Sequence, residues 1–179
     1  MSDCDEQQMI RLLSDTATQR KGFELLVRQY SEQLYWTIRR FVLIHDDAND
    51  VLQNTFLKAW NGLDSYHGDA KISTWLSRIA INESLDFLRR RKQQTVSMDD
   101  ISVSSFIADD YFDGSETEAM LQEAIATLPD VQRTVFLLRY FEEKKYSEIS
   151  QLLNTSEGAL KASYHIAVKK ISDFFKSRD

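Results

Sequence analysis

Apolar residues recur every three or four positions along most of this chain, which is the spacing of one face of an α-helix. A long first stripe consists of Phe23, Leu26, Val27, Tyr30, Leu34, Ile38 and Phe41. Asp46 and Asp47 follow it, where acidic side chains favour the start of another helix. One proline and five glycines among 179 residues leave few helix breakers. The pattern predicts an all-α fold.

The helical periodicity is interrupted once, and this interruption divides the chain into three parts. We predict a helical domain over residues 6–93 and a second over residues 118–176, where four helices follow and Pro129 marks the start of the second of them. Residues 94–117 hold serine, aspartate and scattered apolar residues without a period, which predicts a flexible linker. At 42% apolar composition, each small domain has enough apolar residues for a modest core.

The helix predicted around residues 75–92 carries two chemically different faces. Arg78, Asn82 and Arg89 gather on one side, and guanidinium and amide groups in a row suit phosphate oxygens and base edges. A plain surface helix whose basic end complements its dipole explains the pattern equally well. The apolar side consists of Leu76, Ile79, Ala80 and Phe87.

Residues 146–175 have the layout of a helix-turn-helix, in which the second helix enters the major groove. Asn154 suits the left-handed residue that ends the first helix, and Ser156 suits the N-cap of the second. Many helical hairpins share this pattern, so it is a moderate signal alone. The positions predicted to face inward are Ile149, Leu152, Leu153, Leu160, Tyr164, Val168 and Ile171.

The distribution of charge agrees with a nucleic-acid ligand, although the net charge is −6. Between Gln93 and Gln132 there are nine acidic residues and no lysine or arginine. The remainder of the chain carries 22 basic against 19 acidic residues. This difference in charge between segments indicates that the acidic segment and the rest of the chain have different roles.

Three blocks of the sequence, in this order and at these spacings, resemble the extracytoplasmic-function group of bacterial sigma-70-type factors. The blocks are residues 46–60, residues 73–91 and residues 128–133, the last leading into the predicted helix-turn-helix. The resemblance covers nearly the whole chain. It implies a transcription-initiation factor whose partners are core RNA polymerase, promoter DNA as duplex and as non-template single strand, and an anti-sigma factor.

The resemblance implies that the helix after Asp46 contacts the largest subunit of core RNA polymerase. From the residues alone, its polar side, with Asp47, Asp50, Asn54 and Lys58, would be a solvated face. Phe56 and Trp60 are predicted to belong to the hydrophobic core. The implied polymerase-binding residues are Asp47, Asp50, Gln53 and Asn54.

The loop over residues 64–73 offers aromatic, imidazole and ammonium groups that suit an unstacked base. The resemblance implies that it captures a base flipped out of the non-template strand at the downstream promoter element, assisted by the following helix. A bare structural turn accounts for the loop as well. The implied contacts are Tyr66, His67, Gly68, Asp69, Lys71, Arg78, Asn82 and Arg89.

The second helix of the helix-turn-helix is implied to read the upstream promoter element. Ser163, Ile166 and Val168 stand where many members of the family carry arginine, so this helix is less basic than usual. A promoter sequence cannot be transferred from better-known members. The candidate contacts are Ser156, Glu157, Gly158, Lys161, Ser163, His165 and Lys169.

Other classes of protein are disfavoured. The sequence holds no phosphate-binding glycine loop, nucleophile elbow or metal-ligand cluster, so we expect no catalytic residue, cofactor or metal. An unpaired Cys4, an acidic N-terminus and the absence of a 20-residue apolar run predict a cytoplasmic protein without membrane insertion. The alternatives are a stand-alone helix-turn-helix regulator, which binds operator DNA by itself, and a helical adaptor, which binds proteins only.

Overall fold

The computed structural model describes residues 3–68, 70–93 and 115–178, and within these ranges every long regular element is an α-helix. The chain divides into two compact units, Met1–Val96 and Ser97–Asp179. This confirms the prediction of two small helical domains. Residues 94–114 of the predicted linker lie outside the described residues. None of the helices that the structure describes combines the length and apolar character needed to cross a bilayer.

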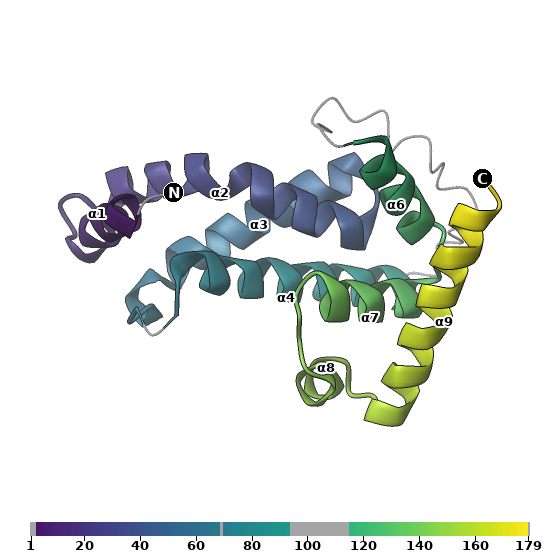
Figure 1. The fold of residues 1–179 in the computed structure, drawn as a ribbon. Coiled ribbons are helices and arrows are strands. Elements are labelled where there is room, and N and C mark those ends of the chain that lie inside the picture. The colour runs from purple at the N-terminus through teal and green to yellow at the C-terminus, as the bar shows by residue number, and fades with distance from the viewer. Residues whose placement is uncertain (1–2, 69, 94–114, 179) are drawn as a thin grey trace. The chain divides into compact units, whose positions relative to one another are not determined.

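The N-terminal unit is built around three long helices that pack against one another, α2 (Gln19–Val42), α3 (His45–Asn61) and α4 (Ile72–Gln93) (Figure 1). Helix α1 (Asp3–Ser14) packs on α2, and a short 3₁₀ turn, η1 (Leu63–Ser65), follows α3. The predicted stripe on α2 faces this core, since its central members are buried. The largest fully buried aliphatic side chains here are Leu26, Leu34, Ile38, Ile72, Leu76 and Ile81.

Two local features set the spacing of these helices. A Cβ atom on Gly22 would lie 2.9 Å from the Cβ of Leu12, so glycine permits the close approach of α1 and α2. Leu43 ends α2 in the left-handed conformation (φ 66°), and its amide donates to the carbonyl of Arg39. Its side chain is buried, and this burial holds a residue other than glycine in that conformation. The connection to α3 is therefore short and fixed.

The C-terminal unit contains α6 (Glu116–Ala126), α7 (Asp130–Tyr140), α8 (Tyr146–Leu153) and α9 (Glu157–Lys176). Helix α9 packs against the other three. Helix α6 begins two residues before the predicted domain start at residue 118. The reason is a capping box, in which the Ser115 hydroxyl accepts from the Glu118 amide and the Glu118 carboxylate accepts from the Ser115 amide.

Two predictions of buried side chains are wrong. Val168 is 42% exposed, and the neighbouring Ala167 is buried in its place against the rest of the unit. Trp60 is 40% exposed, although its ring makes an edge contact with Phe23 at 5.0 Å. Both differences have one origin, because each large apolar side chain stands next to an alanine that is buried instead, Ala167 beside Val168 and Ala59 beside Trp60. The helix turns the small residue inward where the neighbouring helix comes close.

Candidate nucleic-acid interface

The helix-turn-helix predicted in the C-terminal unit is present, formed by α8, the turn at residues 154–156 and α9. Asn154 adopts the left-handed conformation (φ 48°, ψ 48°) that ends α8. The Ser156 hydroxyl accepts a hydrogen bond from the amide of Ala159 at 3.3 Å, which satisfies a free donor at the start of α9. Both predicted turn residues therefore have the predicted conformations.

Helix α9 has a buried side and an open side. Leu160, Ala167 and Ile171 are buried. Tyr164 is half-buried, and its ring stacks on that of Phe136 at 5.8 Å. Ser163, a predicted contact, is also only half-exposed. The remaining predicted contacts of this helix are exposed, namely Ser156, Glu157, Gly158, Lys161, His165 and Lys169.

Lys161 lies near side chains of both helices of the helix-turn-helix, α8 and α9. Its Nζ lies 3.8 Å from Glu157 Oε2 and 5.6 Å from the centre of the Tyr146 ring. The guanidinium of Arg139 lies 5.4 Å from the centre of the same ring. Two cations near one aromatic ring place positive charge on this side of the unit, where it could meet an anionic ligand. Sequence reasoning did not identify Tyr146 and Arg139, because they lie outside the recognition helix.

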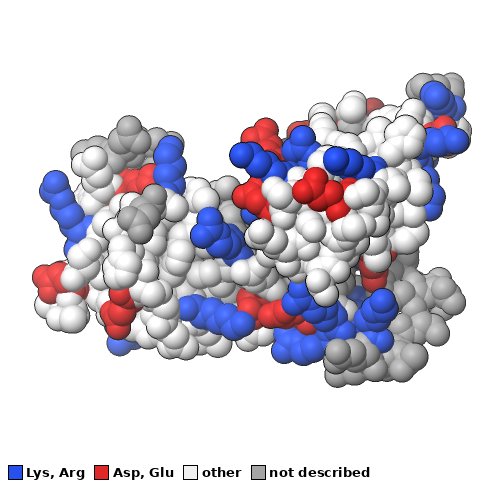
Figure 2. Space-filling model, turned by 90° about the horizontal axis from the view of Figure 1, so that it is seen from below, with Lys and Arg blue, Asp and Glu red and all other residues white. Residues whose placement is uncertain are grey.

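In the N-terminal unit, α4 displays the polar stripe that the sequence predicts. Arg78, Asn82 and Arg89 are exposed along it. Arg89 Nη1 lies 2.8 Å from Asp86 Oδ1, so part of its charge is balanced within the helix. Acidic and basic side chains are interspersed on the face of the molecule that Figure 2 shows.

In the loop before α4, Tyr66 is engaged by contacts within the unit. The Tyr66 hydroxyl donates to the carbonyl of Ala70 at 2.7 Å, and its ring lies 5.0 Å from that of Trp75. Burial, with a smaller effect of Glu6, raises the pKa of the Tyr66 hydroxyl. Gly68 has φ +78°, which glycine adopts without strain. His67 and Lys71 are exposed and available, whereas Asp69 lies outside the described residues.

Helices α3 and α4 are joined by ion pairs between side chains distant in the sequence. Arg91 Nη1 lies 3.6 Å from Asp47 Oδ2, and Lys58 forms an ion pair with Glu83. Asp47 is thus half-buried and engaged within the unit. Its pKa is raised by burial, an effect that Arg91 opposes and that Asp50 and Asp46 reinforce. The other predicted polymerase contacts, Asp50, Gln53 and Asn54, are exposed.

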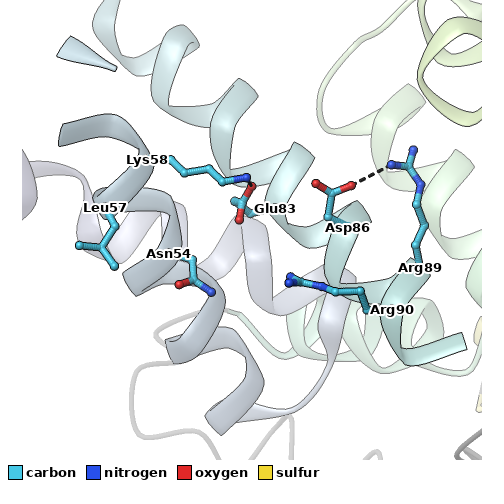
Figure 3. Close-up of a pocket in the computed structure, with 7 residues that line it drawn as sticks. All are labelled: Asn54, Leu57, Lys58, Glu83, Asp86, Arg89 and Arg90. Atoms are coloured by element: carbon cyan, nitrogen blue, oxygen red, sulfur yellow. Dashed lines mark hydrogen bonds and ion pairs between the residues drawn. The ribbon is translucent and has the colours of Figure 1, made fainter. Parts of the chain in front are cut away.

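The Lys58–Glu83 pair lies in a hollow of about 480 Å³ between α3 and α4. Figure 3 shows Lys58 reaching toward Glu83 and Asp86 toward Arg89. Two ion pairs, Lys58–Glu83 and Arg89–Asp86, line the hollow together with the basic Arg90 and the 61% exposed side chain of Leu57. The partnership of Lys58 and Glu83 has no signal in the sequence, because it depends on how the two helices pack. The lining residues are Asn54, Leu57, Lys58, Glu83, Asp86, Arg89 and Arg90.

The chain matches two protein families in succession. Residues 26–94 match Sigma-70 region 2, and residues 118–171 match Sigma-70, region 4. The first match falls within the N-terminal unit and the second within the C-terminal unit.

Similar proteins extend over most of the chain. The ECF RNA polymerase sigma factor SigM of Mycobacterium tuberculosis is 31% identical over 152 residues, covering 84% of this chain and 76% of SigM. The ECF RNA polymerase sigma factor SigW of Bacillus subtilis is 29% identical over 156 residues, covering 80% of this chain and 83% of SigW. The sigma factor RpoE of Bartonella quintana, solved in complex with the anti-sigma factor NepR, has a similar fold. That likeness has a TM-score of 0.59 at 22% identity, covering 87% of this chain and 98% of RpoE.

Proposed function

The chain belongs to the extracytoplasmic-function group of sigma-70 factors, and from that membership we propose how its two units share the work of starting transcription. As a sigma factor, it binds core RNA polymerase and directs it to recognise and melt promoters. The succession of region 2 and region 4 on one chain carries this conclusion. The alternative of a stand-alone regulator is not supported, because the N-terminal unit matches Sigma-70 region 2, which a stand-alone regulator does not need.

We assign the binding of core RNA polymerase to α3 of the N-terminal unit. Asp50, Gln53 and Asn54 form its exposed polar side, and Asp47 contributes from its first turn. The pairing of Asp47 with Arg91 ties this surface to the basic end of α4. We propose that Asp47 acts in part by orienting α3 and that the three exposed residues make the direct contacts.

We assign the downstream promoter element to the loop before α4 and to the exposed stripe on α4. His67 and Lys71 offer an imidazole and a charge beside the fixed Tyr66–Trp75 ring pair. Arg78, Asn82 and Arg89 continue the surface along the helix with donors for phosphates and base edges. Gly68 and Asp69 complete the set predicted from the sequence. A base leaving the duplex would thus meet an ordered loop, which lowers the entropic cost of its capture.

We assign the upstream promoter element to α9, inserted in the major groove. Ser156 and the free amides at the start of the helix face the phosphates, while Lys161, His165 and Lys169 present donors from its exposed side. The remaining predicted contacts, Glu157, Gly158 and Ser163, border this surface.

We further propose three properties that accompany this function. The catalysis of RNA synthesis belongs to the polymerase, and this chain contributes binding energy without reacting groups of its own. It acts in the cytoplasm, where bacterial polymerase meets the chromosome. An anti-sigma factor restrains it, by analogy with the complex of RpoE and NepR.

Reconstitution with purified core RNA polymerase tests the proposal. We expect the chain to cosediment with core polymerase and to direct transcripts from defined start sites, whereas the chain alone should bind duplex DNA weakly. Asp50→Lys should weaken association with core polymerase, and Glu24→Lys, an exposed reversal on α2, should not. A chain that neither joins the polymerase nor selects start sites would contradict the proposal.

A further inference from the structure

The exposed side of the recognition helix α9 carries an aliphatic stripe that the proposed function has not used. Ala159, Ala162 and Ile166 are exposed and recur at a spacing of three and four residues, so they lie above one another on the helix. Ile166 is a large side chain, and 43% of its surface is open to solvent. This stripe lies in the first three turns of α9, the part of a recognition helix that meets base edges.

Helix geometry places this stripe opposite the buried side. At about 100° per residue, Ala162 and Ile166 lie on the far side of the helix from Leu160 and Ile171, which are buried in the unit. Ile166 therefore does not cover the hydrophobic core. The cations Lys161 and Lys169 lie on one flank of the stripe, in reach of a phosphate backbone on that side.

The chemistry of the stripe selects among the edges that the major groove displays. Guanine, cytosine and adenine present hydrogen-bond donors and acceptors there, and an aliphatic side chain cannot satisfy them. Thymine presents a C5-methyl group, which is the apolar feature of the groove. Resting on the proposed function of α9, we infer that Ile166, supported by Ala162, determines specificity in the upstream promoter element by packing on a thymine methyl group.

A single methyl group can be removed from the DNA without changing any hydrogen bond, because deoxyuridine pairs as thymidine does. The complete chain is first assembled with core RNA polymerase, and the holoenzyme selects promoters from duplexes randomised across the upstream element. Each enriched thymine is then replaced singly by deoxyuridine, and promoter occupancy is measured at fixed salt. The loss of one buried methyl group is expected to lower affinity roughly fourfold at one or two positions.

Two variants of α9 identify the side chain responsible. Ile166→Ala should bind the thymine promoter less tightly and should show no further loss when deoxyuridine replaces the critical thymine. Val168→Ala is the matched control, because Val168 is equally exposed at 42% but lies about 160° around the helix from Ile166. It should keep the fourfold penalty. Both positions are exposed, so the helical content of the two variants should equal that of the natural chain.

The outcomes separate the inference from the function on which it rests. A holoenzyme that selects no promoter would overturn both. A holoenzyme that selects promoters but enriches no thymine, or tolerates deoxyuridine everywhere, would overturn the inference and leave the sigma function intact. An equal deoxyuridine penalty in Ile166→Ala and in the natural chain would also overturn it. Loss of the penalty in Ile166→Ala alone would support it.

Discussion

Glu83 places a carboxylate in the interior of the N-terminal unit, with 7% of its side chain exposed, and Lys58 of the neighbouring helix balances its charge. Lys58 itself is 59% exposed, so the lysine remains partly hydrated while the glutamate does not. The pair is therefore asymmetric: most of the desolvation cost falls on Glu83. Removing the lysine is more harmful than removing both partners, because it leaves a buried carboxylate without a counter-ion.

We predict that Lys58→Met lowers the free energy of unfolding by about 1–3 kcal/mol. The double variant Lys58→Met/Glu83→Leu should recover most of this loss, since no buried charge remains. Urea unfolding of both single variants and the double variant completes the cycle. Arg20→Met is the control, because the Arg20–Glu24 pair is 90% and 69% exposed and should contribute less than about 0.5 kcal/mol. Additive effects of the two changes at Lys58 and Glu83 would refute the coupling.

The effect of pH on stability through Asp47 has the opposite sign to that of an ordinary ion-paired carboxylate, whose pKa is lowered by folding. Burial is the largest influence on its pKa and raises it, in spite of Arg91. Folding therefore favours the neutral acid. The contribution of Asp47 to stability is greatest below the usual pKa of aspartate and is lost as the pH rises through the raised value.

We predict that Asp47→Asn raises the free energy of unfolding at pH 7, because it removes the cost of burying the charge. The gain should shrink as the pH falls toward 4, as measured by urea unfolding across this range. Asp50→Asn, at an exposed position on the same helix, should show no such gain. A destabilised Asp47→Asn variant at pH 7 would mean that the Arg91 pairing outweighs burial.

At this scale the sequence predicts which side chains are exposed but not which side chains pair with each other. The exposure of Arg78, Asn82 and Arg89 followed from helical periodicity, because it depends only on the rotation of one helix. The pairing of Asp47 with Arg91 could not be predicted from periodicity. It joins residues 44 positions apart, and the packing of α3 on α4 sets the distance between them. The fixed position of Tyr66 against Trp75 likewise depends on the path of the loop.

At the scale of the element, the helix-turn-helix was predictable because local signals specify where its two helices end and begin. Asn154 and Ser156 fix the turn of the helix-turn-helix through one left-handed residue and one hydroxyl cap. The start of α6 was misplaced, although the sequence carries the serine and the glutamate three positions later that form its capping box. The acidic composition around Ser115 suggested a linker, but the cap and the dipole of the helix stabilise those same carboxylates.

The N-cap of α9 allows its structural and DNA-binding roles to be separated. We predict that Ser156→Ala destabilises the C-terminal unit by about 1 kcal/mol through loss of the hydrogen bond to Ala159. Ser156→Asp should retain the cap and the stability, yet weaken promoter binding, because its negative charge would face the phosphates proposed to lie there. Thermal unfolding and promoter occupancy of the holoenzyme provide the two measurements.

Ser115→Asp is the matched control for this comparison, since Ser115 caps α6 with the same geometry but lies outside the recognition helix. It should leave both stability and promoter occupancy nearly unchanged. If Ser156→Asp binds promoters as well as the natural chain does, the start of α9 does not approach the phosphate backbone.

At the scale of the whole molecule, the function depends on two units that fold separately but act on one promoter. Each unit has its own hydrophobic core and its own proposed DNA surface. Residues 94–114, which lie outside the described part of the structure, join the two units covalently. A covalent connection converts the second DNA contact into an intramolecular event at an effective concentration in the millimolar range.

Cutting the chain between the units should therefore weaken promoter recognition while the described surfaces of both units stay intact. We predict that a protease site placed within residues 94–114 leaves transcription unchanged until it is cleaved, and that cleavage lowers promoter-specific transcripts at nanomolar protein by at least tenfold. Raising both fragments to micromolar concentration should restore much of the signal, because free concentration then replaces the lost connection. Unchanged transcription after complete cleavage at nanomolar protein would mean that the polymerase alone holds the two units in register, and the connection would have no thermodynamic role.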